Sequence, residues 1–211
     1  MHRLSSLLTR LTLETTAHHA LVDEALHGPL EFPTVPAYRQ YLCTLYGFQA
    51  PLEAAVVMTP GMDLAFMRAR LKAGRIASDV LALGLTAKEF RVLARRQTIP
   101  AFRSVPEALG WLYVSERMTL QHETLRHRLA NELAIVVELG GSFLATYHGI
   151  AGERWRELGE LLDQVAWSPD IGDRVVAAAN EAFRSLAGWI AEHSPSVIQL
   201  PSPAASPSRA S

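Results

Sequence analysis

The chain of 211 residues is 49% hydrophobic and 19% charged, which is typical of a globular domain with a substantial core. Its formal net charge of −1 argues against a general nucleic-acid-binding protein, because phosphate binding depends on an excess of Lys and Arg. The single cysteine, Cys43, excludes an intrachain disulfide and indicates a reducing cytosol, and its apolar neighbours predict a buried structural thiol.

The first 30 residues predict one amphipathic helix. Its apolar positions fall on one arc at helical spacing: Leu4, Leu7, Leu8, Leu11, Val22, Ala25 and Leu26. Arg10, Thr12 and Glu14 interrupt the apolar run, so no signal peptide is expected. No stretch approaches the ~20 apolar residues of a membrane span. We therefore expect a cytoplasmic protein that does not enter a membrane.

Two further helices are separated by a loop. The first is predicted over 37–57, where Pro51 is expected to kink or interrupt it, because proline lacks an N–H and clashes with the preceding turn. "TPGMD" at 59–63 predicts the loop. The second is a short helix over 75–84 that ends at Gly84, a residue suited to a C-cap.

Capping patterns predict where the next two helices begin. Thr86 with Glu89, and Ser104 with Glu107, have the spacing of a capping box, in which side chain and backbone satisfy each other's hydrogen bonds. The helix that opens at Ser104 is predicted to continue over 104–136.

The remaining sequence completes an all-α prediction. "LGGSF" at 139–143 breaks the chain, and helices follow over 152–165 and from 168 to about 192. Residues 194–211 are rich in Ser, Pro and Ala and predict a disordered tail. No strand alternation of useful length and no internal repeat occur. We expect one irregular domain of seven or eight helices over 1–193.

Two adjacent histidines, His18 and His19, lie in the first predicted helix. At ~100° per residue, His18 falls about 30° and His19 about 70° from the centre of the apolar arc. Such residues are usually satisfied core or boundary histidines, but a neutral imidazole is also a common metal ligand and a frequent axial ligand of haem iron. Zinc is disfavoured, because "HETLRH" is not H-E-x-x-H and no Cys pair exists.

A basic, hydrogen-bonding cluster interrupts the apolar helix "WLYVSERMTLQHETLRHRL". Arg117 and Gln121 are four residues apart, as are His122 and Arg126, so each pair shares a helix face. The cluster is either a solvated surface or a polar wall over a bound cofactor.

Several segments occur in the order found in one family: "LTLETTAHHALVDEAL", "YRQYLCTLYGFQAPLE", "RIASDVLALG", "GWLYVSE", "LGGSFLATYHG" and "RWRELGELL". In this order they resemble the heme oxygenase family, in particular bacterial biliverdin-forming enzymes often paired with phytochromes. The likeness runs from about Leu7 to Trp189. Thr15, His19 and Asp23 match the family's first-helix motif.

The resemblance implies a haem between the first helix and the helix that contains the cluster. It implies His19 as the axial iron ligand, with His18 as the alternative, and Arg156, or else Arg154, near the haem propionates. It also implies degradation of haem to biliverdin, CO and iron with O2. Electrons would come from a ferredoxin or a reductase, and a bacteriophytochrome is a candidate biliverdin acceptor.

The chain departs from the family where the helix over the haem normally reads "EGSTLGG". Here it reads "ERMTLQH", so Arg117, Gln121 and His122 replace glycines that let the backbone approach the porphyrin. We expect these side chains to contact the haem, with His122 or Gln121 as a candidate sixth iron ligand. The alternatives are a haem carrier or sensor without oxygenase activity, and a non-haem ligand whose carboxylate or phosphate is bound by Arg117 and Arg126.

Overall fold

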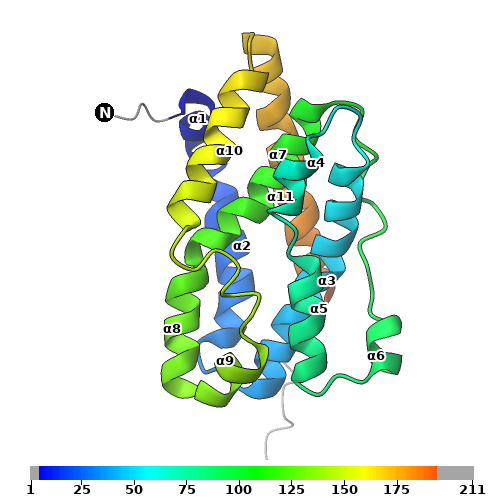
Figure 1. Cartoon of the computed structure of the whole chain (residues 1–211), viewed down its shortest axis with the longest axis vertical. Coiled ribbons are helices and arrows are strands. Elements are labelled where there is room, and N and C mark those ends of the chain that lie inside the picture. Colours follow the sequence, from blue (N-terminus) through cyan, green and yellow to red (C-terminus); the bar gives the residue numbers. More distant parts are fainter. Residues whose placement is uncertain (1–4, 194–211) are drawn as a thin grey trace, which may run out of the picture.

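A computed structural model describes residues 5–193, and all regular secondary structure in this range is helical (Figure 1). The helices are α1 (Ser6–Glu14), α2 (Thr16–His27), α3 (Val35–Val57), α4 (Leu64–Arg68), α5 (Ala73–Ala82), α6 (Ala87–Arg91), α7 (Val105–Met118), α8 (His122–Glu132), α9 (Ala134–Gly140), α10 (Ala151–Val165) and α11 (Pro169–His193), with 3₁₀ turns η1 (Gly28–Leu30) and η2 (Thr119–Gln121). The all-α prediction is confirmed. The tail predicted over 194–211 lies outside the described residues.

The long helix α11 is the centre of the bundle. It packs along α7 and also against α2, α3 and α1. The closest approach is to α7 at Gly110, where a Cβ atom would meet the carbonyl oxygen of Val175 and lie 2.7 Å from the Cβ of Ala178. Glycine is therefore required there for the two helices to pack.

None of the helices between residues 5 and 193 is long and apolar enough to cross a membrane.

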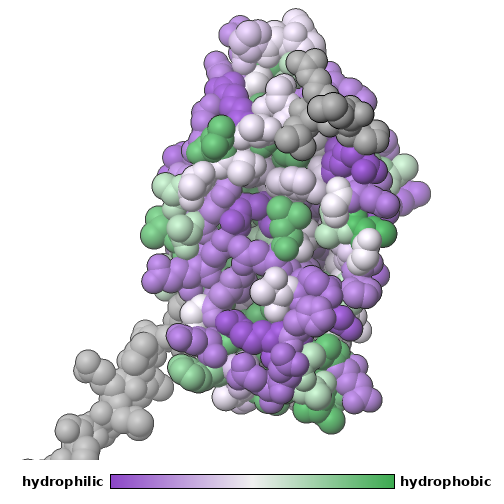
Figure 2. All heavy atoms as spheres, turned by 90° about the vertical axis from the view of Figure 1, so that its left-hand side faces the viewer, coloured by the Kyte–Doolittle hydropathy of each residue, from purple (hydrophilic) through white to green (hydrophobic). Residues whose placement is uncertain are grey.

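The outer surface is mainly polar. Figure 2 shows the face that lies to the left in Figure 1, where apolar residues are scattered among hydrophilic ones rather than gathered into one patch.

The described residues form eleven α-helices instead of the predicted seven or eight, and one additional break lies at Thr15. The Thr15 hydroxyl bonds to the carbonyl oxygen of Leu11 at 2.7 Å and its backbone leaves the helical region at φ −109°, ψ 8°. Side chains of this type compete with the helical backbone for its hydrogen bonds. The predicted first helix is therefore two helices, α1 and α2.

The helix predicted over 104–136 is also divided. Thr119 donates its hydroxyl to the carbonyl oxygen of Glu116 at 2.6 Å, and the chain tightens into η2. At Leu133, φ −139° and ψ 61° separate α8 from α9. The polar cluster thus spans a break rather than the middle of a straight helix.

The helix-end predictions have mixed outcomes. Gly84 has φ 90° beyond α5, and Thr86 with Glu89 forms both hydrogen bonds of a capping box. Ser104 makes no capping hydrogen bond, and the Glu107 carboxylate accepts from the backbone N–H of Arg103 rather than from that of Ser104.

Pro51 does not interrupt α3, which was predicted to kink or break there. Proline leaves the carbonyl four residues earlier, that of Gly47, without its helical donor. The backbone N–H of Arg96 supplies that donor at 2.8 Å. A loop distant in the sequence therefore satisfies the group that Pro51 leaves unpaired.

Cys43 is half-buried on α3, not fully buried as predicted. It lines a cavity of about 530 Å³ with Trp189 and His193. Burial raises the pKa of its thiol, which favours the unreactive protonated form.

Candidate functional site

Three helices bring the first predicted site residue, His19, into a cluster of aromatic rings. Both α2 and α7 pack on α11. On α11, the ring of Phe183 contacts His19 and Tyr113, with ring centroids 5.0 and 6.3 Å away. His19 comes from α2 and Tyr113 from α7, and their rings are 6.3 Å apart.

His19 is 8% exposed and its Nε2 atom has two hydroxyl neighbours. The Oγ1 atom of Thr15 is 2.6 Å away and the hydroxyl of Tyr113 is 3.3 Å away. Burial, followed by the charge of Arg117, lowers the pKa of His19 to about 4. The ring is therefore neutral at physiological pH, the form in which imidazole binds a metal.

His18 lies beside the same cluster of rings. It is half-buried, and its ring stacks on Phe183 with centroids 5.9 Å apart. The periodicity placed His18 nearer the centre of the apolar arc than His19, but the order of burial is the reverse. The break at Thr15 changes the geometry of the arc from which that angle was measured.

Arg117 and Gln121 face α2 rather than solvent. Both terminal nitrogens of Arg117 bind the carboxylate of Asp23, at 2.8 and 2.7 Å. The side-chain amide of Gln121 donates to the same carboxylate at 2.7 Å. Burial raises the pKa of the Asp23 carboxyl, but the hydrogen bonds and charge of Arg117 outweigh this effect and lower the pKa below its usual value.

His122 is placed apart from these residues. It is 5% exposed, its ring packs edge-on against Phe143, and neither ring nitrogen has a hydrogen-bond partner within the described residues. It lines a cavity of about 340 Å³ with Tyr147 and His148. The structure therefore does not bring His122 to His19.

The remaining predicted arginines lie in three settings. Arg126 is half-buried on α8. Arg154 bonds to Glu157 on α10 at 2.8 Å. Arg156 is exposed and lines a cavity of about 320 Å³ between α1 and α10. Trp155 lines this cavity, and its ring lies 5.6 Å from that of Tyr113. The cavity therefore adjoins the cluster of rings around His19.

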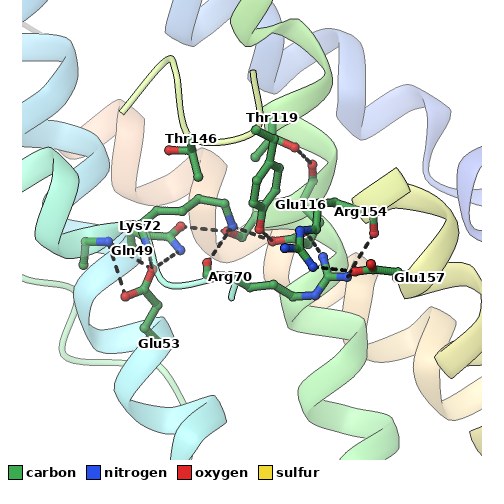
Figure 3. Close-up of polar contacts among 12 residues, drawn as sticks. Gln49, Glu53, Arg70, Lys72, Glu116, Thr119, Thr146, Arg154 and Glu157 are labelled. Carbon is green, nitrogen blue, oxygen red and sulfur yellow. Dashed lines mark hydrogen bonds and ion pairs between the residues drawn. The ribbon is translucent and has the colours of Figure 1, made fainter. Parts of the chain in front are cut away.

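A buried polar network behind α7 was not predicted (Figure 3). The carboxylate of Glu116 binds Arg70 at 2.6 Å, Lys72 at 2.5 Å and the hydroxyl of Tyr147 at 3.1 Å. Further hydrogen bonds connect Lys72 to Ser115, Ser115 to Gln49 and Gln49 to Glu53. The only local signal was an acidic residue directly after the apolar run "WLYVS".

Metal coordination by protein side chains alone has no support in this geometry. Between residues 5 and 193, no group of three His, Cys, Asp or Glu side chains is arranged to hold a metal ion. A single histidine, as at His19, is instead a common protein ligand of haem iron.

Comparison with known proteins identifies the family. The sequence model of the heme oxygenase family matches residues 5–192. Heme oxygenase PigA of Pseudomonas aeruginosa is 27% identical over 180 residues, which is 82% of this chain and 86% of that protein. The NO- and CO-bound heme oxygenase of Neisseria meningitidis has the same fold, with a TM-score of 0.67 and 21% identity over 89% of this chain and 91% of that one.

The fold and the family match therefore define a helical domain of the heme-oxygenase type. The chain belongs to the heme oxygenase family. The predicted family, the all-α fold and haem as the family's ligand are confirmed.

Proposed function

We propose that this chain binds haem between α2 and the α7–η2–α8 segment and degrades it to biliverdin, CO and iron. Family membership supports haem binding and haem degradation. The observation that supports this site is His19, a buried and neutral imidazole on α2 that faces Tyr113 of α7. His19 is the proposed axial ligand of the iron, with His18 as the alternative.

The surrounding side chains have separate proposed roles. A pKa of about 4 keeps the lone pair of His19 free of a proton at neutral pH. Tyr113 and Phe183 hold its ring in place. Arg156 is proposed to bind a haem propionate, with Arg154 as the second choice. Arg156 lines the cavity that Trp155 connects to the cluster of rings around His19.

The proposed reaction needs partners that carry electrons and remove product. O2 and an external electron donor such as a ferredoxin or reductase supply the oxidation, and a bacteriophytochrome is a proposed acceptor of biliverdin. The proposed compartment is the cytoplasm. Bound haem would supply the oxygen chemistry, and the protein's residues would hold and orient it.

The test is turnover of the haem complex. Purified protein loaded with haem is given ascorbate or a reductase system in air, and the visible spectrum is followed. We expect the haem bands to fall and a biliverdin band to rise. Binding of haem without a biliverdin band under several reductants would contradict the enzymatic proposal.

A further inference from the structure

Three donors converge on the carboxylate of Asp23, and they come from α7 and η2. Asp23 lies on α2, one helical turn after His19. Arg117, near the end of α7, and Gln121, in η2, both reach across to it. The side chain of Arg117 is 15% exposed and that of Asp23 is 22% exposed. The contact is therefore a sheltered, bidentate ion pair with one added amide donor.

A ligand that enters between α2 and η2 must separate this contact. The separation would leave the guanidinium of Arg117 sheltered and without an anion, and an uncompensated charge of this kind is costly. Asp23 is the more exposed partner and would turn toward solvent, whereas Arg117 would stay sheltered. The ligand best suited to this position is one that brings its own carboxylate, because planar guanidinium and carboxylate groups pair through two hydrogen bonds.

We propose that Arg117 and Gln121 form a carboxylate-binding site and that Asp23 occupies it as an internal competitor. This inference rests on the proposed function, since haem has two propionate carboxylates. A propionate takes the position of the Asp23 carboxylate, and Asp23 turns to water. The two residues that replace glycines thus bind the ligand's acid group, and Asp23 sets how tightly haem is held.

The proposal predicts a specific pattern in the dissociation constant of ferric haem, measured by absorbance titration. Asp23→Asn removes the competitor and keeps the size of the side chain, so haem should bind about ten-fold more tightly, the effect of one charge-assisted hydrogen bond. Arg117→Met alone should stay close to wild type, because it removes the site and the competition together. Adding Arg117→Met to Asp23→Asn should abolish the ten-fold gain. Arg96→Met, which breaks the sheltered ion pair with Glu192 away from the proposed haem site, is the matched control and should change nothing.

The dimethyl ester of haem, which lacks free carboxylates, distinguishes this proposal from a contact that only holds the two helices together. The double variant should bind the ester as tightly as Asp23→Asn does, but it should bind haem less tightly than Asp23→Asn does. If Arg117→Met and the double variant both bind haem as tightly as Asp23→Asn does, the contact only holds the helices together and the proposal is overturned.

The outcomes also separate this inference from the proposed function. Haem binding by wild type that is unchanged in Asp23→Asn overturns the carboxylate site and leaves the proposed function standing. Failure of wild type and of every variant to bind haem overturns both.

Discussion

The Nε2 atom of His19 lies 2.6 Å from the Oγ1 atom of Thr15, which also bonds to the carbonyl oxygen of Leu11. The Thr15 hydroxyl has one proton. When that proton goes to Leu11, Nε2 must donate to Thr15, and the lone pair of the neutral ring then lies on Nδ1. Thr15 therefore competes with a metal for Nε2.

Replacing Thr15 with valine should remove that competition. We expect Thr15→Val to bind ferric haem about five-fold more tightly, the effect of one hydrogen bond of ordinary strength. Thr16→Val is the matched control, because the exposed Thr16 hydroxyl bonds only to the carbonyl of Thr12. Absorbance titration measures both. Weaker haem binding by Thr15→Val would show that the hydroxyl supports the ligand instead.

The contact between α7 and α11 at Gly110 should be sensitive to one methyl group. Gly110→Ala places a Cβ against the backbone of α11, and we expect a loss of about 1–3 kcal/mol in the free energy of unfolding. Gly74→Ala is the control, since Gly74 lies in α5 with no atom near its would-be Cβ. It should gain up to about 1 kcal/mol. Urea unfolding compares the two, and equal effects would contradict the packing.

Glu116 should be essential to the buried network. Glu116→Gln leaves Arg70 and Lys72 with too little negative charge, and we expect about 3–5 kcal/mol of destabilisation. Glu14→Gln breaks an exposed pair with Arg10 and should cost less than about 1 kcal/mol. Unfolding in urea at neutral pH measures both. A Glu116→Gln protein as stable as wild type would show that the network is dispensable.

His122 should make stability depend on pH. Burial, followed by the charges of Lys72 and His27, lowers its pKa from 6.5 to about 3. Between these values the unfolded chain binds a proton that the folded chain does not. The free energy of unfolding therefore falls as pH falls below about 6.5, by up to about 1.4 kcal/mol per pH unit for one histidine.

The variant His122→Leu should show a smaller fall in stability between pH 7 and pH 4. His19, whose pKa is also lowered, retains its own share of the effect. The exposed His127, replaced in the same way, serves as control and should leave the slope as in wild type. Equal slopes for wild type and His122→Leu would contradict the buried, neutral state of this ring.

Local patterns predicted the helical class and several helix ends. Helical periodicity located the apolar faces, and the spacing of Thr86 and Glu89 predicted a capping box that forms. The breaks at Thr15 and Thr119 were missed, because a threonine hydroxyl that bonds to a helix carbonyl leaves no trace in hydrophobic periodicity. The outcome at Pro51 depended on a donor 45 positions away in sequence, in Arg96.

The site was predicted only in part, because its contacts also join residues that are distant in the sequence. Motif order identified the family and singled out His19, whose partners Thr15 and Tyr113 are now defined. No sequence pattern indicated that Arg117 and Gln121 would share one carboxylate, because Asp23 is 94 residues from Arg117. Contacts of that range depend on how α2 and α7 are placed on α11.

The most direct test of the account is the haem titration of wild type, His19→Ala and His18→Ala, followed by visible absorption. We predict that wild type and His18→Ala bind haem stoichiometrically, that His19→Ala loses the spectrum of a histidine-ligated haem, and that added imidazole restores it. An unchanged spectrum in His19→Ala, with loss of binding in His18→Ala, would contradict the assignment of His19 as the haem ligand.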